Sequence, residues 1–243
     1  MRCEIHDVHL WRARTQELAA DAGELAATLS PDEQQRAQGF ALRKDREAFI
    51  LRRGLLRAIL SQYLPEGPDE IRFRHGYFGK PHLDLGSHRP GLYFNLSHRM
   101  GLVLCALGRG GPLGVDVEFL APMRDVDDMA AQFLPGHESA AIAALPPADR
   151  LLAFYIRWTR QEAYLKAKGD GLTQAPDPIP PSAGQVETIW PAPGYVGALA
   201  SEAGIGQISW RDWPADRAEP APALRQGRSA DSRPTREDVW SGS

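Results

Sequence analysis

The sequence predicts an α+β fold, and three of its features favour this class. Short apolar segments between residues 71 and 119 are separated by glycine and proline, as expected for strands joined by turns. Longer segments with helical periodicity precede and follow them, at 43–63 and 147–168. The strands lack the regular strand–helix–strand spacing of a parallel sheet and look antiparallel. The 243 residues, 43% of them hydrophobic, allow one large domain or two subdomains.

The N-terminal part is expected to begin with a strand and continue with helices. Residues 4–12 have the pattern of a strand, and the Ala- and Leu-rich residues 16–29 that of a helix. Ser30-Pro31-Asp32-Glu33 is a capping-box sequence, with Ser30 as N-cap and Glu33 directed back to it. The helix at 43–63 that follows carries apolar residues on one face and arginines on the other.

The rest of the chain is expected to form strands, then helices, then closing strands. The segments IRF, LYFNLS, LVLCALG and LGVDVEFL are the expected middle strands. We expect helices at 125–133, 136–144 and 147–168, a proline-rich segment at 175–184, and strands at 195–201 and 207–213. The last thirty residues, 214–243, contain almost nothing apolar and are expected to be disordered.

Composition and charge argue against several classes of protein. A net charge of −3 argues against bulk nucleic-acid binding. Cys3 and Cys105 lie far apart without the spacing of a zinc site. No apolar run approaches the length of a membrane helix, and residues 1–15 do not have the pattern of a signal peptide. We therefore expect a protein of the cytoplasm that acts without a membrane or a nucleic acid.

Two carboxylates share one face of the expected strand Leu113–Phe119. Alternation places Asp116 and Glu118 together, roughly 6–7 Å apart at their Cα atoms. Like charges this close repel unless a positive group lies between them, and carboxylate oxygens suit a hard cation such as Mg²⁺. The alternative is a half-buried strand with a polar outer face.

The helix at 147–168 presents further charged groups at helical spacing. Trp158, Glu162 and Lys166 fall along one stripe of this helix. Glu162 is then a third metal-side carboxylate and Lys166 a partner for phosphate. The alternative is a simple i,i+4 ion pair, worth roughly 0.2–0.5 kcal/mol.

Two loops and one helix face add candidate phosphate ligands. Lys80 lies in a turn between Gly79 and Pro81, and Ser97 and His98 lie near the end of a strand. The arginine-rich face of the helix at 43–63 is a further candidate. The alternative for the arginines is a solvated face, and for the histidine a structural role.

Taken in order, four motifs resemble those of the 4'-phosphopantetheinyl transferases of the long, surfactin-synthetase-activating type. They are G-K-P at 79–81, N-x-S-H at 95–98, G-x-D-x-E at 114–118 and W-x₃-E-x₃-K at 158–166. The resemblance covers about residues 8–213. It implies a magnesium-dependent transfer of phosphopantetheine from coenzyme A to a serine of an apo acyl or peptidyl carrier protein. It also implies a monomer of two similar α+β halves, about 1–112 and 113–213, with the active site in the cleft between them.

The resemblance also implies roles for individual residues. Asp116, Glu118 and Glu162 correspond to the ligands of Mg²⁺ or Mn²⁺, and Lys166 to the lysine that contacts the diphosphate. We take Glu162 as the catalytic base, acting directly or through water, with Lys166 as the second catalytic residue. The implied coenzyme A ligands are Lys80, Ser97, His98, Lys166 and the arginines of the 43–63 helix, especially Arg53 and Arg57.

The sequence departs from the family pattern at two places. Gln161 stands where the family usually has a lysine, and Arg160 beside it points about 100° away around the helix. The stretch from Leu172 to Tyr195 is shorter and richer in proline than in typical members, so a strand or hairpin is expected to be missing there.

Two other functions and one docking surface remain open at this point. The chain is alternatively a non-catalytic homologue that binds coenzyme A or a carrier, or a Mg²⁺-dependent phosphohydrolase built on the same carboxylates. Residues 119–135, with Phe119, Met123, Met129, Phe133 and Leu134, are a candidate carrier-docking surface; the alternative is ordinary core packing.

Overall fold

The computed structural model describes residues 6–77, 79–84, 91–169, 178–180 and 185–214. The predicted tail beyond Pro214 and most of the proline-rich segment 175–184 lie outside the described residues. In chain order the elements are β1 (Val8–Arg14), α1 (Thr15–Leu18), the 3₁₀ helix η1 (Ala19–Asp21), α2 (Ala22–Ala27), α3 (Pro31–Gln38), α4 (Arg43–Leu60), β2 (Phe73–His75), β3 (Pro81–Leu83), β4 (Tyr93–Arg99), β5 (Leu102–Gly108), β6 (Leu113–Phe119), α5 (Val126–Phe133), α6 (Gly136–Ala143), α7 (Pro147–Lys168), β7 (Gln185–Ile189), β8 (Tyr195–Ser201) and β9 (Ile208–Asp212). This is the mixed α/β architecture that the sequence predicts.

Most elements lie close to their predicted positions, with two main differences. The helix expected at 16–29 is divided into α1, η1 and α2. Strand β7 lies in the stretch between residues 172 and 195, where the sequence predicts no strand; whether typical members have a further strand or hairpin there stays a prediction. The capping box at Ser30 is confirmed, and the Ser30 backbone N–H donates to Glu33 Oε2 at 3.1 Å. This interaction fixes the start of α3.

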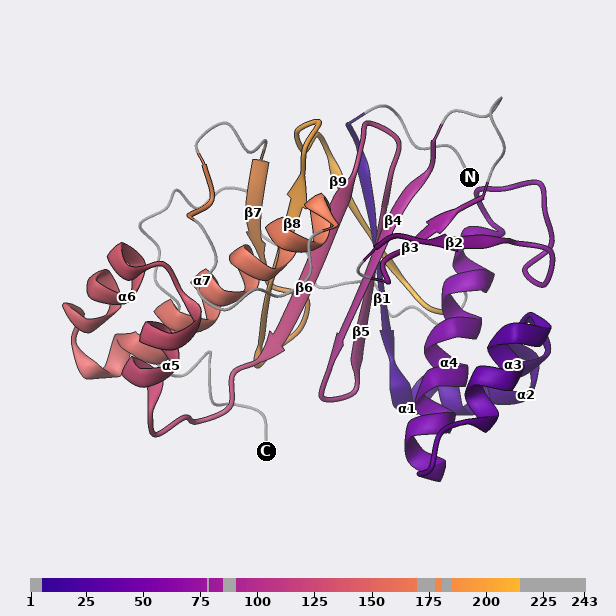
Figure 1. Cartoon of the computed structure of the whole chain (residues 1–243), viewed down its shortest axis with the longest axis horizontal. Helices are drawn as coiled ribbons and strands as arrows, with labels where there is room; N and C mark the ends of the chain where they lie inside the picture. Colours follow the sequence, from indigo (N-terminus) through magenta and orange to yellow (C-terminus); the bar gives the residue numbers. More distant parts are fainter. Residues whose placement is uncertain (1–5, 78, 85–90, 170–177, 181–184, 215–243) are drawn as a thin grey trace.

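The strands form two larger sheets and one hairpin (Figure 1). The first sheet has the order β4-β5-β1-β9, and the second has the order β6-β8-β7. Strand β9 pairs in parallel with β1, so the residues 208–212 return to the sheet of the first half. Strands β2 and β3 pair antiparallel in a hairpin of their own.

Apolar side chains divide the interior between the two sheets and their helices. One cluster joins α4 to the first sheet through residues such as Leu55, Ile59 and Trp11. A second cluster joins the two sheets, and includes Leu104 and Val115. Figure 1 shows α7 lying across the second sheet, where it packs on β6 and β8. Of the described helices, none is long and apolar enough to cross a membrane.

Candidate active site

The predicted motifs meet where β4 of the first sheet lies beside β6 of the second. The Asn95 side-chain oxygen accepts a hydrogen bond from the Val115 backbone N–H at 2.9 Å. Ser97 Oγ lies 2.9 Å from Asp116 Oδ1, to which it donates. Two polar side chains of β4 therefore hold β6 in a fixed register, and they bring the N-x-S-H motif to the G-x-D-x-E motif.

Alternation along β6 directs its carboxylates toward α7. Val115 and Val117 are buried in the core between the sheets, while Asp116 and Glu118 are on the opposite face. Gly114 allows the helix to approach, because a Cβ atom at this position would lie 2.1 Å from the Ala163 carbonyl oxygen. The glycine of the motif thus lets the backbones of β6 and α7 touch directly.

The helix contributes Glu162 and Lys166, one turn apart, to the same site. Lys166 Nζ lies 2.6 Å from Asp116 Oδ1 and 3.3 Å from Ser97 Oγ. Asp116 and Glu162 are buried, with 5% and 7% of their surface exposed. The spacing of the two motifs in the sequence therefore becomes a cluster of three carboxylates and one ammonium group in the fold.

Two carboxylates of this cluster, Glu162 and Glu118, hold protons more strongly than usual. Burial raises the pKa of Glu162 to about 7; the negative charge of Asp116 adds to this effect, and Lys166 opposes it. Burial also raises the pKa of Glu118, against the charge of Arg99, which forms an ion pair with its Oε2 at 2.8 Å. In the metal-free protein, burial therefore favours the protonated form of both glutamates.

The donor atoms suit a hard divalent cation. Asp116 Oδ2 and Glu162 Oε1 are buried and have no hydrogen-bond partner within the described part of the chain. Carboxylate oxygens left in this way are the ligand type that Mg²⁺ prefers. In this structure, however, these oxygens are not arranged as a metal site. Among the described residues, no group of three or more His, Cys, Asp or Glu side chains is placed to hold a metal ion. Lys166 and Arg99 lie beside the carboxylates instead.

His98 adjoins the cluster in a positive environment. Burial, and after it the charges of Arg52, Lys166 and Arg99, lower the pKa of its imidazole to about 4. The ring is therefore neutral at neutral pH, and of the surrounding cations Lys166 and Arg99 are paired with Asp116 and Glu118. Arg52 belongs to the arginine-rich face of the helix at 43–63 that the sequence indicates, and Arg99 directly follows His98 in the sequence; in the fold both lie close enough to act on His98.

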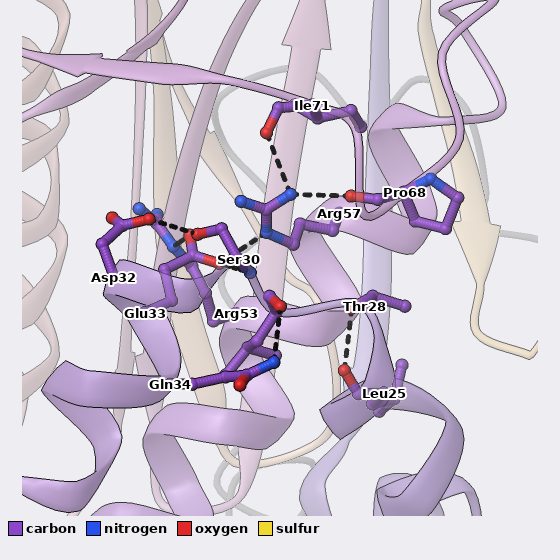
Figure 2. Close-up of polar contacts among 11 residues, drawn as sticks. Leu25, Thr28, Ser30, Asp32, Glu33, Gln34, Arg53, Arg57, Pro68 and Ile71 are labelled. Atoms are coloured by element: carbon purple, nitrogen blue, oxygen red, sulfur yellow. Dashed lines mark hydrogen bonds and ion pairs between the residues drawn. The ribbon is translucent and has the colours of Figure 1, made fainter.

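Arg53 and Arg57, both predicted to bind coenzyme A, contact Glu33 (Figure 2). Arg57 is 1% exposed, and its guanidinium donates to Glu33 Oε2 at 2.6 Å and to the carbonyls of Pro68 at 2.7 Å and Ile71 at 2.9 Å. The coenzyme A role of Arg57 stays a prediction, and this placement speaks against it. Arg57 joins α3, α4 and the segment before β2.

Arg53 differs from Arg57 because it also borders open space. Its guanidinium contacts Glu33 and lies 4.4 Å from the ring centroid of Phe73. A cavity of about 200 Å³ lies beside it, lined in part by Phe49, Arg52, Pro81 and Asn95. Arg53 also lines a second cavity of about 570 Å³, together with Glu33 and Arg57. With 13% of its side chain exposed against 1% for Arg57, Arg53 is the more accessible of the two predicted arginines.

Lys80, the predicted lysine of the G-K-P motif, is half-buried and directed at backbone carbonyls. Its Nζ donates to Leu113 O at 3.1 Å, to Ala167 O at 3.2 Å and to Lys166 O. Burial lowers the pKa of this ammonium to about 8, and the charge of Glu202 partly opposes that shift. The predicted phosphate contact of Lys80 stays a prediction.

Gln161 and Arg160 also have defined places. Gln161 is 1% exposed, so the position at which the family usually has a lysine is buried here. Arg160 is directed to β7, where its NH1 lies 3.4 Å from Thr188 Oγ1. Arg160 therefore does not take the place of that lysine.

Comparison with known proteins agrees with these motifs. A family model described as 4'-phosphopantetheinyl transferase superfamily matches residues 112–196, and one described as 4'-phosphopantetheinyl transferase, N-terminal, matches residues 9–108. The chain is 39% identical over 168 residues to 4'-phosphopantetheinyl transferase HetI of Nostoc sp., covering 69% of this chain and 71% of that protein. It is 26% identical over 171 residues to 4'-phosphopantetheinyl transferase Sfp of Bacillus subtilis, covering 70% and 72%. It is 33% identical over 118 residues to 4'-phosphopantetheinyl transferase AcpT of Salmonella typhimurium, covering 49% and 58%. The chain belongs to the 4'-phosphopantetheinyl transferase superfamily.

Proposed function

We propose that the protein transfers the 4'-phosphopantetheine arm of coenzyme A to a serine hydroxyl of an apo acyl or peptidyl carrier protein. The other product is adenosine 3',5'-bisphosphate. The observation that carries this proposal is the meeting of Asp116, Glu118, Glu162 and Lys166 at the contact of β6 with α7. In a chain of this superfamily, such a cluster is suited to a substrate that carries a diphosphate.

Asp116, Glu118 and Glu162 would hold a Mg²⁺ or Mn²⁺ ion. The buried oxygens Asp116 Oδ2 and Glu162 Oε1, which have no hydrogen-bond partner among the described residues, support this assignment, as does the raised pKa of Glu162. A bound divalent cation supplies charge neutralisation for the phosphates. Lys166 and Arg99 would have to share or leave the carboxylates that they contact in this structure.

The chemical step needs a group that accepts the serine proton. Glu162 is the proposed acceptor: without a metal its pKa is raised to about 7, and a cation bound beside it would favour the charged carboxylate, the form that can accept a proton. The serine oxygen attacks the phosphorus of the phosphopantetheine arm, and its proton passes to Glu162 directly or through water. The bond from that phosphorus to the bridging oxygen breaks, and the electron pair leaves with the adenosine bisphosphate. Lys166 stabilises the negative charge that develops.

The nucleotide end of coenzyme A is proposed to lie along α4 and β4. Arg52 and Arg53 line the cavity of about 200 Å³ with Phe49, and His98 is close to Arg52. Guanidinium groups beside an apolar wall suit a phosphorylated nucleoside. Coenzyme A would then extend from the first half, 1–112, toward the carboxylates of the second half, 113–213. We propose that the site lies between these halves in a monomer.

Residues 119–135 remain only a proposed surface for the carrier. Leu134 is buried, and Met123 and Met129 are partly buried against the cluster of α5, α6 and α7. This packing supports the alternative of a core role for these residues. Which carrier protein is modified is therefore determined with a panel of apo-carriers.

The proposed function is tested by incubating the protein with coenzyme A, Mg²⁺ and a panel of apo-carriers, and measuring intact mass. We expect one carrier to gain the mass of a single phosphopantetheine arm, and this gain to disappear when EDTA replaces Mg²⁺. Binding of coenzyme A without any gain in carrier mass would indicate the non-catalytic homologue instead. Release of nucleotide without a carrier would indicate a phosphohydrolase.

A further inference from the structure

We propose that Lys80 is a positioning residue, which holds the last turn of α7 against the start of β6 and thereby sets the relative places of Lys166 and Asp116. The expected effect on catalysis rests on the proposed function. The positioning role itself rests on the hydrogen bonds of Lys80 and does not depend on that function.

The partners of Lys80 lie on the two elements that build the site. Lys80 donates to three carbonyl oxygens. Two of them, Lys166 O and Ala167 O, belong to the end of α7, and the third belongs to Leu113, the first residue of β6. The last four carbonyls of a helix have no partner within the helix. One ammonium group therefore satisfies helix carbonyls and also joins them to the strand.

The position of these acceptors connects Lys80 to the reacting groups. The backbone oxygen of Lys166 accepts a hydrogen bond from Lys80, and its side-chain Nζ donates to Asp116 Oδ1 at 2.6 Å. Leu113 precedes Asp116 by three residues on the same strand. A slide of α7 along β6 would change the Lys166–Asp116 distance, and the contacts of Lys80 oppose that slide.

Other packing also holds α7 on the strands, including Ala167 near its end, but among the described contacts Lys80 adds the polar link between the last carbonyls of α7 and β6. The missing side chain of Gly114 allows the Ala163 carbonyl to approach the strand. Beyond Lys168, Gly169 takes a left-handed conformation with φ of 80° and ends the helix. Lys80 arrives from the turn before β3, in the first half of the chain, so it also ties the proposed nucleotide side to the catalytic helix.

The matched variants are Lys80→Met and Lys168→Met. Methionine keeps an apolar stem of similar length and removes the ammonium group. Lys168 is in the same last turn of α7, is exposed, and lies 5.7 Å from the Tyr164 ring centroid. Lys168→Met therefore removes the same charge from the same helix end, without removing the contacts to Leu113, Lys166 and Ala167.

Hydrogen exchange of the free, full-length protein gives the first measurement. We expect the amides of the last turn of α7 to exchange about tenfold faster or more in Lys80→Met than in the wild type or Lys168→Met. Exchange at the wild-type rate in Lys80→Met would overturn the proposal. Because this measurement needs no turnover, it remains decisive even where the wild type modifies no carrier, an outcome that would defeat the proposed function alone.

Steady-state kinetics give the second measurement. We expect kcat of Lys80→Met to fall about 10–100-fold, because small displacements of catalytic groups are costly, while KM for coenzyme A changes less than about threefold. An increase in KM with kcat unchanged would show a direct phosphate contact and would overturn the proposal. Faster exchange with unchanged kcat would also overturn it, since Lys80 would then be only structural. Where Lys80→Met does not fold, Lys80→Arg is measured in the same two ways. Because arginine can still donate to the carbonyls, we expect exchange and kcat close to the wild-type values, and an increase in KM for coenzyme A with kcat unchanged would overturn the proposal.

Discussion

Lys166 Nζ lies 2.6 Å from Oδ1 of Asp116, and this contact joins the helix motif to the strand motif. The same Asp116 oxygen accepts a hydrogen bond from Ser97 at 2.9 Å, so three motifs that are distant in the sequence meet at one carboxylate. The second oxygen, Oδ2, is buried and has no hydrogen-bond partner among the described residues. Asp116 is therefore positioned by the protein on one side and left available to a cation on the other.

Glu162→Gln should lower kcat by at least about 10²-fold, because the amide cannot accept the serine proton. The variant keeps the size of the side chain and removes only its charge. The rate of holo-carrier formation, followed by mass, is the measurement. Wild-type turnover in Glu162→Gln would remove this residue from the mechanism.

The stability of the metal-free protein should depend on pH through Glu162. Its folded-state pKa is raised from 4.5 to about 7, so the folded state retains a proton that the unfolded state loses. The stabilising effect is complete below about pH 4.5 and is lost as the pH rises through 7. This is measured by urea unfolding in EDTA. Between pH 5 and pH 8, the free energy of unfolding of the wild type should fall by on the order of 2 kcal/mol more than that of Glu162→Gln. An equal difference at both pH values would show that Glu162 is not perturbed.

Added Mg²⁺ should reverse this trend. At pH 8, where Glu162 is charged, a cation that binds only the folded state raises the melting temperature. We expect a larger rise for wild type than for Glu162→Gln, which has lost one proposed ligand. Equal shifts would place the binding of Mg²⁺ elsewhere.

Arg57→Met should destabilise the protein by about 3–5 kcal/mol, because it leaves buried Glu33 without one of its guanidinium partners. Burial alone would raise the pKa of Glu33, but the hydrogen bond from Arg57 and the charges of Arg53 and Arg57 lower it overall. The control is Arg43→Met, whose ion pair with Glu47 involves a side chain 82% exposed and should change stability by less than about 0.5 kcal/mol. Urea unfolding measures both. A loss of coenzyme A affinity with stability unchanged would instead restore the predicted ligand role of Arg57.

Gly114→Ala should reduce both stability and kcat, because its Cβ would lie 2.1 Å from the Ala163 carbonyl oxygen and α7 would have to move off β6. Gly23→Ala is the matched control, since a Cβ there meets nothing within 4 Å. We expect the control to be neutral or to gain about 0.5–1 kcal/mol from helix propensity. Thermal melts and carrier assays distinguish the two. Wild-type behaviour of Gly114→Ala would show that the close approach is not needed.

Local patterns predicted most of the elements. The capping box at Ser30 and the alternation of Leu113–Phe119 are found as predicted, because both depend on interactions among near neighbours in the chain. The prediction of one long helix at 16–29 was wrong because η1 interrupts it, and nothing in the Ala- and Leu-rich pattern indicates the break. Strand β7 was missed because its proline-rich surroundings masked a five-residue strand.

The sequence by itself determined which side chains carry charge, which face of each strand or helix they occupy, and in what order the four motifs follow one another. Only the tertiary structure decided which charges meet. Arg57 and Lys80 are ordinary cations in the sequence, yet one pairs with Glu33, and the other with carbonyls of β6 and α7. The physical reason is that burial makes an unpaired charge or carbonyl costly, and the partner that satisfies it is chosen by packing between distant segments.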